Sequence, residues 1–306
     1  MRQVFSAILF LVTFSIYSQQ LPQFSQFMFN QYAFNPAYSG VKPSWEAITN
    51  NRYQWTGITD APRTFTLSAQ GPFKKENMAI GGYVYTDNVG PTRRLGFQTS
   101  YAYHIKLNET IKLSFGLSVG FNQWILDADK ITTYHPGDFY FSNGLLKSTD
   151  FDGKFGLYLY HADWHFGASV EQMLHNKISF LATQTSSESY LEDHFNVHAG
   201  YTFRIGDDWE IDPMALLKIG LPAPLKFDIN LRTTYKKTVW LGFGFRSNDA
   251  VTGMLGYCYK ELLRIGYAYD FTITDLKNYN TGTHEIMLGF IFAKSKSASD
   301  TSPSLE

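Results

Sequence analysis

The sequence predicts an all-β protein: a transmembrane antiparallel β-barrel of about 14 strands (12–16), with an N-terminal segment packed in or under its lumen. Three observations support this prediction. From residue 45 to residue 293 apolar and polar residues alternate with a period of two, which is typical of strands. The apolar faces match the roughly 9–11 residues that a tilted strand needs to cross a bilayer. The connections between strands also alternate between short polar turns and longer loops.

Residues 1–18 are predicted to be a cleaved signal peptide. Arg2 supplies the positive start, Val4 to Ile16 form the apolar stretch, and Ser18 is a small residue before the expected cut. The apolar stretch falls short of the roughly 20 residues that a spanning helix requires. No cysteine directly follows the apolar stretch, which argues against a lipoprotein. We therefore expect an exported protein without a transmembrane helix.

Residues 19–44 are predicted to form an aromatic, plug-like segment before the barrel. The stretch from Pro22 to Gly40 contains six aromatic residues and no charge, so it is too polar to cross a membrane and too aromatic to be a solvated tail. Asn35-Pro36 is expected to turn the chain. We expect the segment to fold against the inner wall or under the periplasmic mouth. The candidate plug residues are Phe24, Phe27, Phe34, Asn35, Pro36 and Tyr38.

Residues 45–293 are predicted to form the barrel. Between Ile111 and Asn122, for example, the odd positions are large and apolar and the even positions are small or polar. This pattern places the odd positions against lipid and the even positions in the lumen. The expected strands cover residues 45–55, 63–73, 78–86, 94–106, 111–126, 151–161, 164–174, 193–205, 209–219, 226–235, 238–247, 251–260, 262–273 and 284–293.

An even strand count places both ends of the barrel on the side of the short turns, which is the periplasmic side in outer-membrane barrels. The longer loops then face the outside. Residues 294–306 are Ser-rich and are expected to form a flexible tail. Aromatic residues near strand ends are expected to form interfacial girdles, and they include Trp55, Tyr101, Trp124, Trp164, Trp209, Trp240 and Tyr259.

The composition and motifs do not indicate an enzyme. A net charge of -1 gives no electrostatic reason for nucleic-acid binding, and the single cysteine, Cys258, excludes an intrachain disulfide. Gly116–Gly120 fits the Gly-x-Ser-x-Gly pattern but lies within an alternating strand instead of a strand-to-helix elbow. His161 and His165 straddle a tight turn and do not lie on one helix face. We expect no catalytic residues, no metal site and no cofactor.

Charged and polar residues at the outward ends of the first and last strands are the candidate partner-binding or lumen-network residues. In a closed barrel these strands are neighbours, so we expect their outward ends to lie side by side. Inward-pointing arginines would pair with lumen carboxylates such as Asp228, Asp270 and Glu285, while outward-pointing ones would be solvated loop charges. The candidates are Arg52, Gln54, Trp55, Arg63, Asp270, His284 and Glu285.

Three segments of this chain resemble the PorP/SprF family of outer-membrane proteins from Bacteroidota. They are "PQFSQFMFNQYAFNPAYSG", "NRYQWTGITDAPRTFTLSAQGPF" and "IGYAYDFTITDLKNYNTGTHEIMLGF". The resemblance implies a component of the type IX secretion system in the cell outer membrane. It implies that the protein binds or retains secreted cargo, such as a large surface adhesin with a C-terminal sorting domain, or links the translocon to periplasmic parts. In some members it implies support for gliding motility.

The expected partners are therefore outer-membrane lipid, a secreted adhesin or its sorting domain, and other type IX secretion components, including periplasmic proteins. A second hypothesis remains open at this point. A diffusion porin or small-solute transporter would show the same strand pattern, because porins are also barrels with a polar lumen. The two hypotheses differ in whether the lumen is open.

Overall fold

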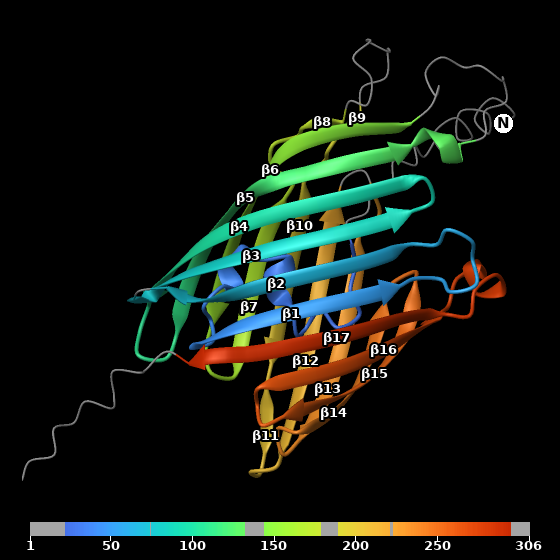
Figure 1. The fold of residues 1–306 in the computed structure, drawn as a ribbon. Coiled ribbons are helices and arrows are strands. Elements are labelled where there is room, and N and C mark those ends of the chain that lie inside the picture. Colours follow the sequence, from blue (N-terminus) through green and yellow to red (C-terminus); the bar gives the residue numbers. More distant parts are fainter. Residues whose placement is uncertain (1–21, 74, 132–143, 179–188, 221–222, 295–306) are drawn as a thin grey trace, which may run out of the picture.

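The computed structural model describes residues 22–73, 75–131, 144–178, 189–220 and 223–294. These residues form one closed antiparallel barrel, so the predicted fold class is confirmed (Figure 1). The predicted signal peptide and residues 295–306 lie outside the described residues. The barrel strands are β1 (Ser44–Tyr53), β2 (Arg63–Phe73), β3 (Lys75–Val89), β4 (Thr92–Lys106), β5 (Lys112–Asp127), β6 (Leu145–Tyr160), β7 (Trp164–Glu171), β10 (His194–Tyr201), β11 (Phe203–Ile205), β12 (Trp209–Gly220), β13 (Lys226–Tyr235), β14 (Val239–Arg246), β15 (Ala250–Tyr259), β16 (Leu263–Thr272) and β17 (Thr283–Lys294).

The barrel contains 14 strand positions because β10 and β11 follow one another along β12. Each strand pairs with the next along the chain, β1 pairs with β17, and β10 pairs with both β7 and β12. The ring is thereby closed, and a closed ring leaves no sheet edge exposed to lipid. A separate two-stranded hairpin, β8 (Lys177–Ile178) with β9 (Ser189–Tyr190), lies in the connection after β7.

The side chains alternate as expected along the strands. In β5, Leu117 and Val119 are exposed on the outer face, whereas Ser114 and Ser118 are buried inside the barrel. The same alternation continues through β14, where Val239 is exposed and Trp240 is buried. The outer surface is therefore an apolar belt that suits lipid, and the inner surface carries the polar residues.

The two ends of the barrel differ in their connections. At one end the strands are joined by short turns, such as residues 161–163, 236–238 and 260–262. Lys236, Lys237, Lys260 and Glu261 have positive φ angles, as two-residue hairpin turns require. Ser44 of β1 and Lys294 of β17 pair at this end. We call it the short-turn end, and we call the end with residues 54–62 and 273–282 the loop end.

Some predicted boundaries and positions are wrong. β6 begins at Leu145 instead of residue 151, and β7 ends at Glu171 instead of residue 174. β6 is 16 residues long, which exceeds the length needed to cross the bilayer, so its outer part need not follow the apolar pattern. Trp240 is buried in the lumen and does not join an interfacial girdle. In the described residues, no helix is long and apolar enough to span a membrane.

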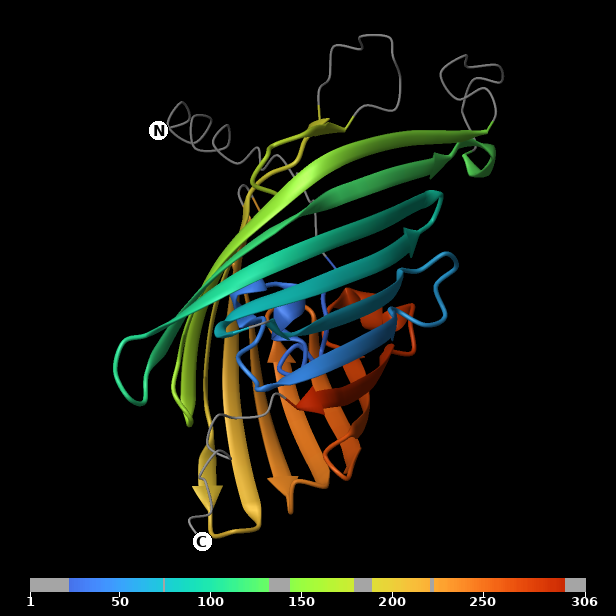
Figure 2. The ribbon, with the colours of Figure 1, turned by 60° about the vertical axis from the view of Figure 1, so that its left-hand side comes forward.

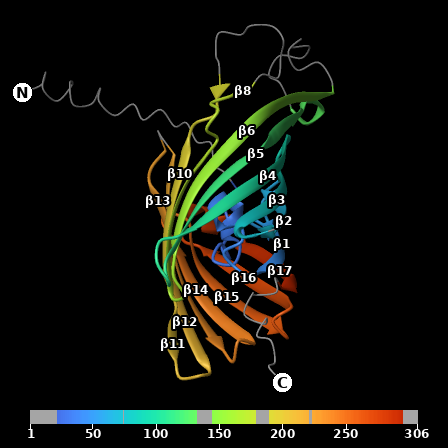
Figure 3. The same cartoon turned by 90° about the vertical axis from the view of Figure 1, so that its left-hand side faces the viewer.

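The segment before β1 lies inside the barrel (Figures 2 and 3). It contains two short 3-10 helices, η1 (Gln31–Ala33) and η2 (Pro36–Tyr38). Two further 3-10 turns, η3 (Ala128–Lys130) and η5 (Asp275–Asn278), lie in loops at the loop end. Nearly all side chains from Phe24 to Ser39 are buried. We call residues 22–40 the plug; its aromatic side chains form the core of the barrel together with inward-facing wall residues.

Candidate functional site: the plug and its charged anchor

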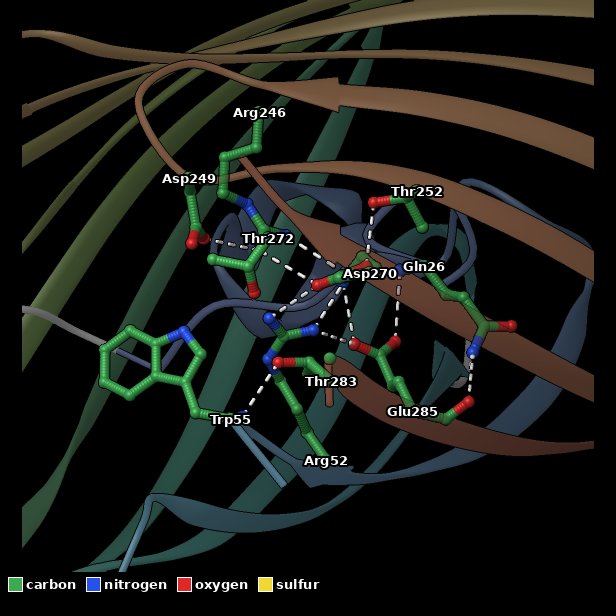
Figure 4. Close-up of polar contacts among 12 residues, drawn as sticks. Gln26, Arg52, Trp55, Arg246, Asp249, Thr252, Asp270, Thr272, Thr283 and Glu285 are labelled. Carbon is green, nitrogen blue, oxygen red and sulfur yellow. Dashed lines mark hydrogen bonds and ion pairs between the residues drawn. The ribbon is translucent and has the colours of Figure 1, made fainter. Parts of the chain in front are cut away.

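Three of the residues singled out in the sequence meet inside the barrel near the loop end (Figure 4). Arg52 of β1 pairs with Asp270 of β16 at 2.7 Å and with Glu285 of β17 at 3.3 Å. All three side chains are almost completely buried. The pairing of Arg52 with Glu285 in the β1–β17 register also confirms that the outward ends of the first and last strands are neighbours.

These charged groups hold the beginning of the plug. The Ser25 hydroxyl donates to the Asp270 carboxylate and accepts from Arg52 Nη1 at 2.8 Å. Glu285 accepts the backbone N–H groups of Ser25 at 2.7 Å and Gln26 at 3.0 Å. Charge-assisted hydrogen bonds of this kind are stronger than neutral ones. The plug backbone therefore adds two hydrogen bonds to a buried carboxylate, Glu285, that also pairs with Arg52.

Arg246 of β14 completes the cluster from the other side of the plug. Its guanidinium lies 3.4 Å from Asp270, 3.2 Å from Asp249 and 3.4 Å from Asp228. Asp228 also pairs with Lys218 at 2.7 Å. We call Ser25, Arg52, Arg246, Asp270 and Glu285 the charged anchor. Because its charges alternate in sign and are hydrogen-bonded, the cluster satisfies groups that would be costly to bury singly.

The other residues singled out in the sequence lie outside the anchor. Gln54 and Trp55 follow β1 in the loop, where the Gln54 N–H bonds the Pro62 carbonyl and the Trp55 N–H bonds the Thr283 hydroxyl at 3.0 Å. Arg63 is exposed at the start of β2. His284 points to the outer face, opposite Glu285, and contacts the Tyr267 hydroxyl at 2.7 Å.

The far part of the plug rests on a different kind of surface. Asn35 caps η2 by accepting from the Ala37 N–H at 3.0 Å, and its amide donates to the Leu157 carbonyl at 3.0 Å and lies 3.1 Å from His198 Nε2. A side chain at Gly116 would overlap the backbone of Pro36–Ala37. A side chain at Gly156 would overlap Asn35, and one at Gly167 would overlap His198. We call the three positions, Gly116, Gly156 and Gly167, the glycine seat.

The middle of the plug is held by neutral hydrogen bonds. Tyr32 contacts the Ser100 hydroxyl at 2.8 Å, and the Tyr158 hydroxyl donates to Gln31 at 2.9 Å. Burial raises the pKa of Tyr32 to about 12, with the Ser100 hydrogen bond acting in the opposite direction. The phenol is therefore protonated at neutral pH. Among the described residues, no group of three or more His, Cys, Asp or Glu side chains is arranged to hold a metal ion.

Sequence reasoning missed Ser25, Arg246 and the glycine seat. The signal for the glycines was present, because Gly116 and Gly156 lie at lumen-facing positions where a small residue permits close backbone approach. Arg246 carried little local signal, since only Asp249 lies near it in the sequence and its other carboxylate partners come from β13 and β16.

The closed barrel, its apolar outer belt and its filled lumen define the class of protein: a plugged outer-membrane β-barrel. A family model described as "Type IX secretion system membrane protein PorP/SprF" matches residues 16–290. The chain therefore belongs to the PorP/SprF family of the type IX secretion system. No curated protein matches the chain.

Solved structures of outer-membrane proteins are similar to this chain at low sequence identity. A FadL homologue from Pseudomonas aeruginosa is 11% identical, covers 90% of this chain and 95% of its own length, and has a TM-score of 0.51. The toluene transporter TbuX from Ralstonia pickettii is 10% identical, with coverage of 84% and 91% and a TM-score of 0.49. Outer membrane protein Omp33 from Acinetobacter baumannii is 11% identical, with coverage of 83% and 99% and a TM-score of 0.47. At 11% identity, the likeness to the FadL homologue concerns the fold alone.

Proposed function

We propose that this protein is a non-enzymatic, plugged scaffold of the type IX secretion system in the outer membrane. It binds or retains secreted cargo, such as a large adhesin with a C-terminal sorting domain, and/or links the translocon to periplasmic parts. Where the cargo is a motility adhesin, the same retention would serve gliding. The signal peptide predicted at residues 1–18 would export the chain to the outer membrane.

The observation that carries the proposal is the filled lumen. The plug is buried along its length and anchored through Ser25 to Arg52, Asp270 and Glu285. A diffusion porin needs an open polar channel, and a plug held by buried ion pairs opposes that function. A rigid barrel whose lumen is closed by a packed plug is better suited to hold loops in fixed positions for a partner.

The loop end offers a surface for such a partner. Residues 54–62 and 273–282 are joined by backbone bonds from the Thr56 N–H to the Gly282 carbonyl at 2.8 Å and from the Thr281 N–H to the Thr56 carbonyl at 2.7 Å. We call these two loops the rim platform. Tyr279 is 74% exposed and Leu276 is 38% exposed on it. Exposed aromatic residues on a fixed backbone are typical binding anchors.

The test is retention of a reporter fused to the C-terminal sorting domain of a secreted adhesin. We expect the double substitution Leu276→Ala and Tyr279→Ala to shift the reporter from the cell surface to the medium while the barrel stays folded. The matched control is Tyr259→Ala, an exposed tyrosine at the short-turn end, which should leave retention unchanged. Equal surface retention in the platform variant and the parent protein would refute binding at the rim platform.

A further inference from the structure

A cavity of about 500 Å³ lies inside the short-turn end of the barrel, on the far side of the plug from the charged anchor. Its roof is the plug itself, through Met28, Phe29, Gln31 and Tyr38. Its walls are the short-turn ends of β6, β7 and β10 and of β12 through β17. This volume lies within the range of pockets that bind small molecules or short peptide segments.

Aromatic rings form much of the cavity lining. Phe29 of the plug packs on Trp240 with ring centroids 4.6 Å apart, and the Arg232 guanidinium lies 4.8 Å above Phe29. Tyr38 packs edge-on against Tyr158 at 5.5 Å. Surfaces of this kind bind apolar and aromatic side chains through area burial and ring–ring contact.

The charges of the lining are balanced. Four basic residues and four acidic residues line the cavity, and three of the basic ones, Lys42 among them, already have carboxylate partners. Arg232 pairs with Asp212 at 2.8 Å, and Arg264 pairs with Glu46 at 2.5 Å. Because these cations are neutralised, the cavity favours a ligand without net charge over a phosphate or a carboxylate. The eight residues are Lys42, Arg232, Lys237, Arg264, Asp163, Glu210, Asp212 and Glu261.

Two buried nitrogen atoms of the lining residues have no hydrogen-bond partner in the described part of the chain. They are Trp240 Nε1 and His165 Nε2. The indole nitrogen can only donate, and the imidazole nitrogen donates in one tautomer. Both atoms are buried, so a ligand reaches them only if the lining side chains shift, and it would then have to offer an acceptor such as a carbonyl oxygen.

We propose that this cavity binds a short peptide segment that carries a large apolar or aromatic side chain and enters from the short-turn end. A peptide backbone is neutral and supplies carbonyl acceptors, while its side chain packs on the rings. An acyl chain would leave the polar wall groups without partners. The inference rests on the proposed function in one respect: the short-turn end faces the periplasm, so the segment belongs to a periplasmic partner of the secretion machinery.

The native protein contains its own reporter for this site. Cys258 is the only cysteine of the chain and lines the cavity. The experiment measures the rate at which N-ethylmaleimide modifies Cys258 in the purified full chain. The probes are the capped tripeptides acetyl-Gly-Phe-Gly-amide and acetyl-Gly-Gly-Gly-amide, and a trisaccharide of N-acetylglucosamine. We expect the Phe peptide at saturation to slow the modification of Cys258 about tenfold. A tenfold change corresponds to about 1.4 kcal/mol.

Trp240→Phe keeps an aromatic ring and removes the indole donor, so it should weaken protection by the Phe peptide about tenfold. The matched control is Trp209→Phe, at an exposed position at the same end, which should leave protection unchanged. Protection by the trisaccharide alone would overturn the proposal in favour of a glycan site. Absence of protection by the Phe peptide, or full protection in Trp240→Phe, would also overturn it. None of these outcomes depends on cargo retention at the rim platform, so the two proposals can fail separately.

Discussion

The two ends of the plug are held in different ways. At Ser25 the wall provides buried charges, with Arg52, Asp270 and Glu285 all in contact with the plug. At Asn35–Ala37 the wall provides space, since the lumen-facing glycines Gly116 and Gly156 allow the plug to lie directly on the strands. Charge-assisted hydrogen bonds are stronger than neutral ones, whereas close packing leaves the plug no room to shift. The charged anchor therefore binds the plug tightly to the wall, and the glycine seat fixes the position of the plug on the strands.

The largest effect is expected from Glu285→Ala in the charged anchor. The change leaves Arg52 with one partner fewer and removes the acceptor of the Ser25 and Gln26 N–H groups. Breaking a buried pair in this way costs roughly 3–5 kcal/mol. Urea unfolding of the purified barrel measures the loss. The control is Glu109→Ala in an exposed turn, and similar midpoints for the two variants would contradict a role for the anchor.

A smaller but still large effect is expected at the glycine seat. Gly116→Val places a branched side chain where the plug backbone lies, so the plug must shift, at a cost of roughly 1–3 kcal/mol. Gly253→Val is the matched control, because a Cβ at Gly253 meets no atom within 4 Å. The accessibility of the plug to added protease is the readout. If both variants were cleaved alike, the seat would not fix the plug.

Asn35→Ala tests the polar part of the seat. It removes the η2 cap and the bond to the Leu157 carbonyl, and we expect a loss of roughly 1–3 kcal/mol in unfolding free energy. Asn88→Ala on an exposed part of β3 should change stability by less than about 0.5 kcal/mol. The comparison requires only denaturation curves, and a neutral Asn35→Ala would show that packing alone holds η2.

The smallest effect is expected from Tyr32→Phe, which removes one hydrogen bond to Ser100 and costs roughly 0.5–1.5 kcal/mol. Its clearest signature is pH dependence. The pKa of Tyr32 is about 12 when folded and 10.0 in the reference state, so its contribution is complete below pH 10 and decreases as pH rises toward 12. The variant should therefore lose less stability than the parent protein over this interval. Identical pH profiles would exclude the Tyr32 contribution.

Much of the fold could be predicted because a barrel wall repeats a local rule. The period of two places Leu117 outside and Ser118 inside without knowledge of any partner strand. The strand ends were less predictable, since β6 has 16 residues, more than a strand needs to cross a bilayer, and the rule does not fix where such a strand begins. Trp240 was placed wrongly because an inward tryptophan depends on a partner, Phe29, that lies more than 200 residues earlier in the chain.

The site was predictable in part. Arg52 and Glu285 could be brought together by closure of the barrel alone, which makes the first and last strands neighbours. Arg246 and Ser25 could be assigned to the charged anchor only once the path of the plug through the lumen was known. That path is set by contacts among segments that lie far apart in the sequence. Alternation placed His284 and Glu285 on opposite faces, and Glu285, expected among the lumen carboxylates, is buried inside the barrel.

The central claim is that this member of the PorP/SprF family is a sealed scaffold, and conductance tests it most directly. The purified protein and a variant lacking residues 22–40 are inserted into planar bilayers under the same conditions. We predict negligible steady conductance for the intact protein and a stable open channel for the variant. An intact protein that conducts as an open pore, or a folded variant that stays closed, would contradict the claim.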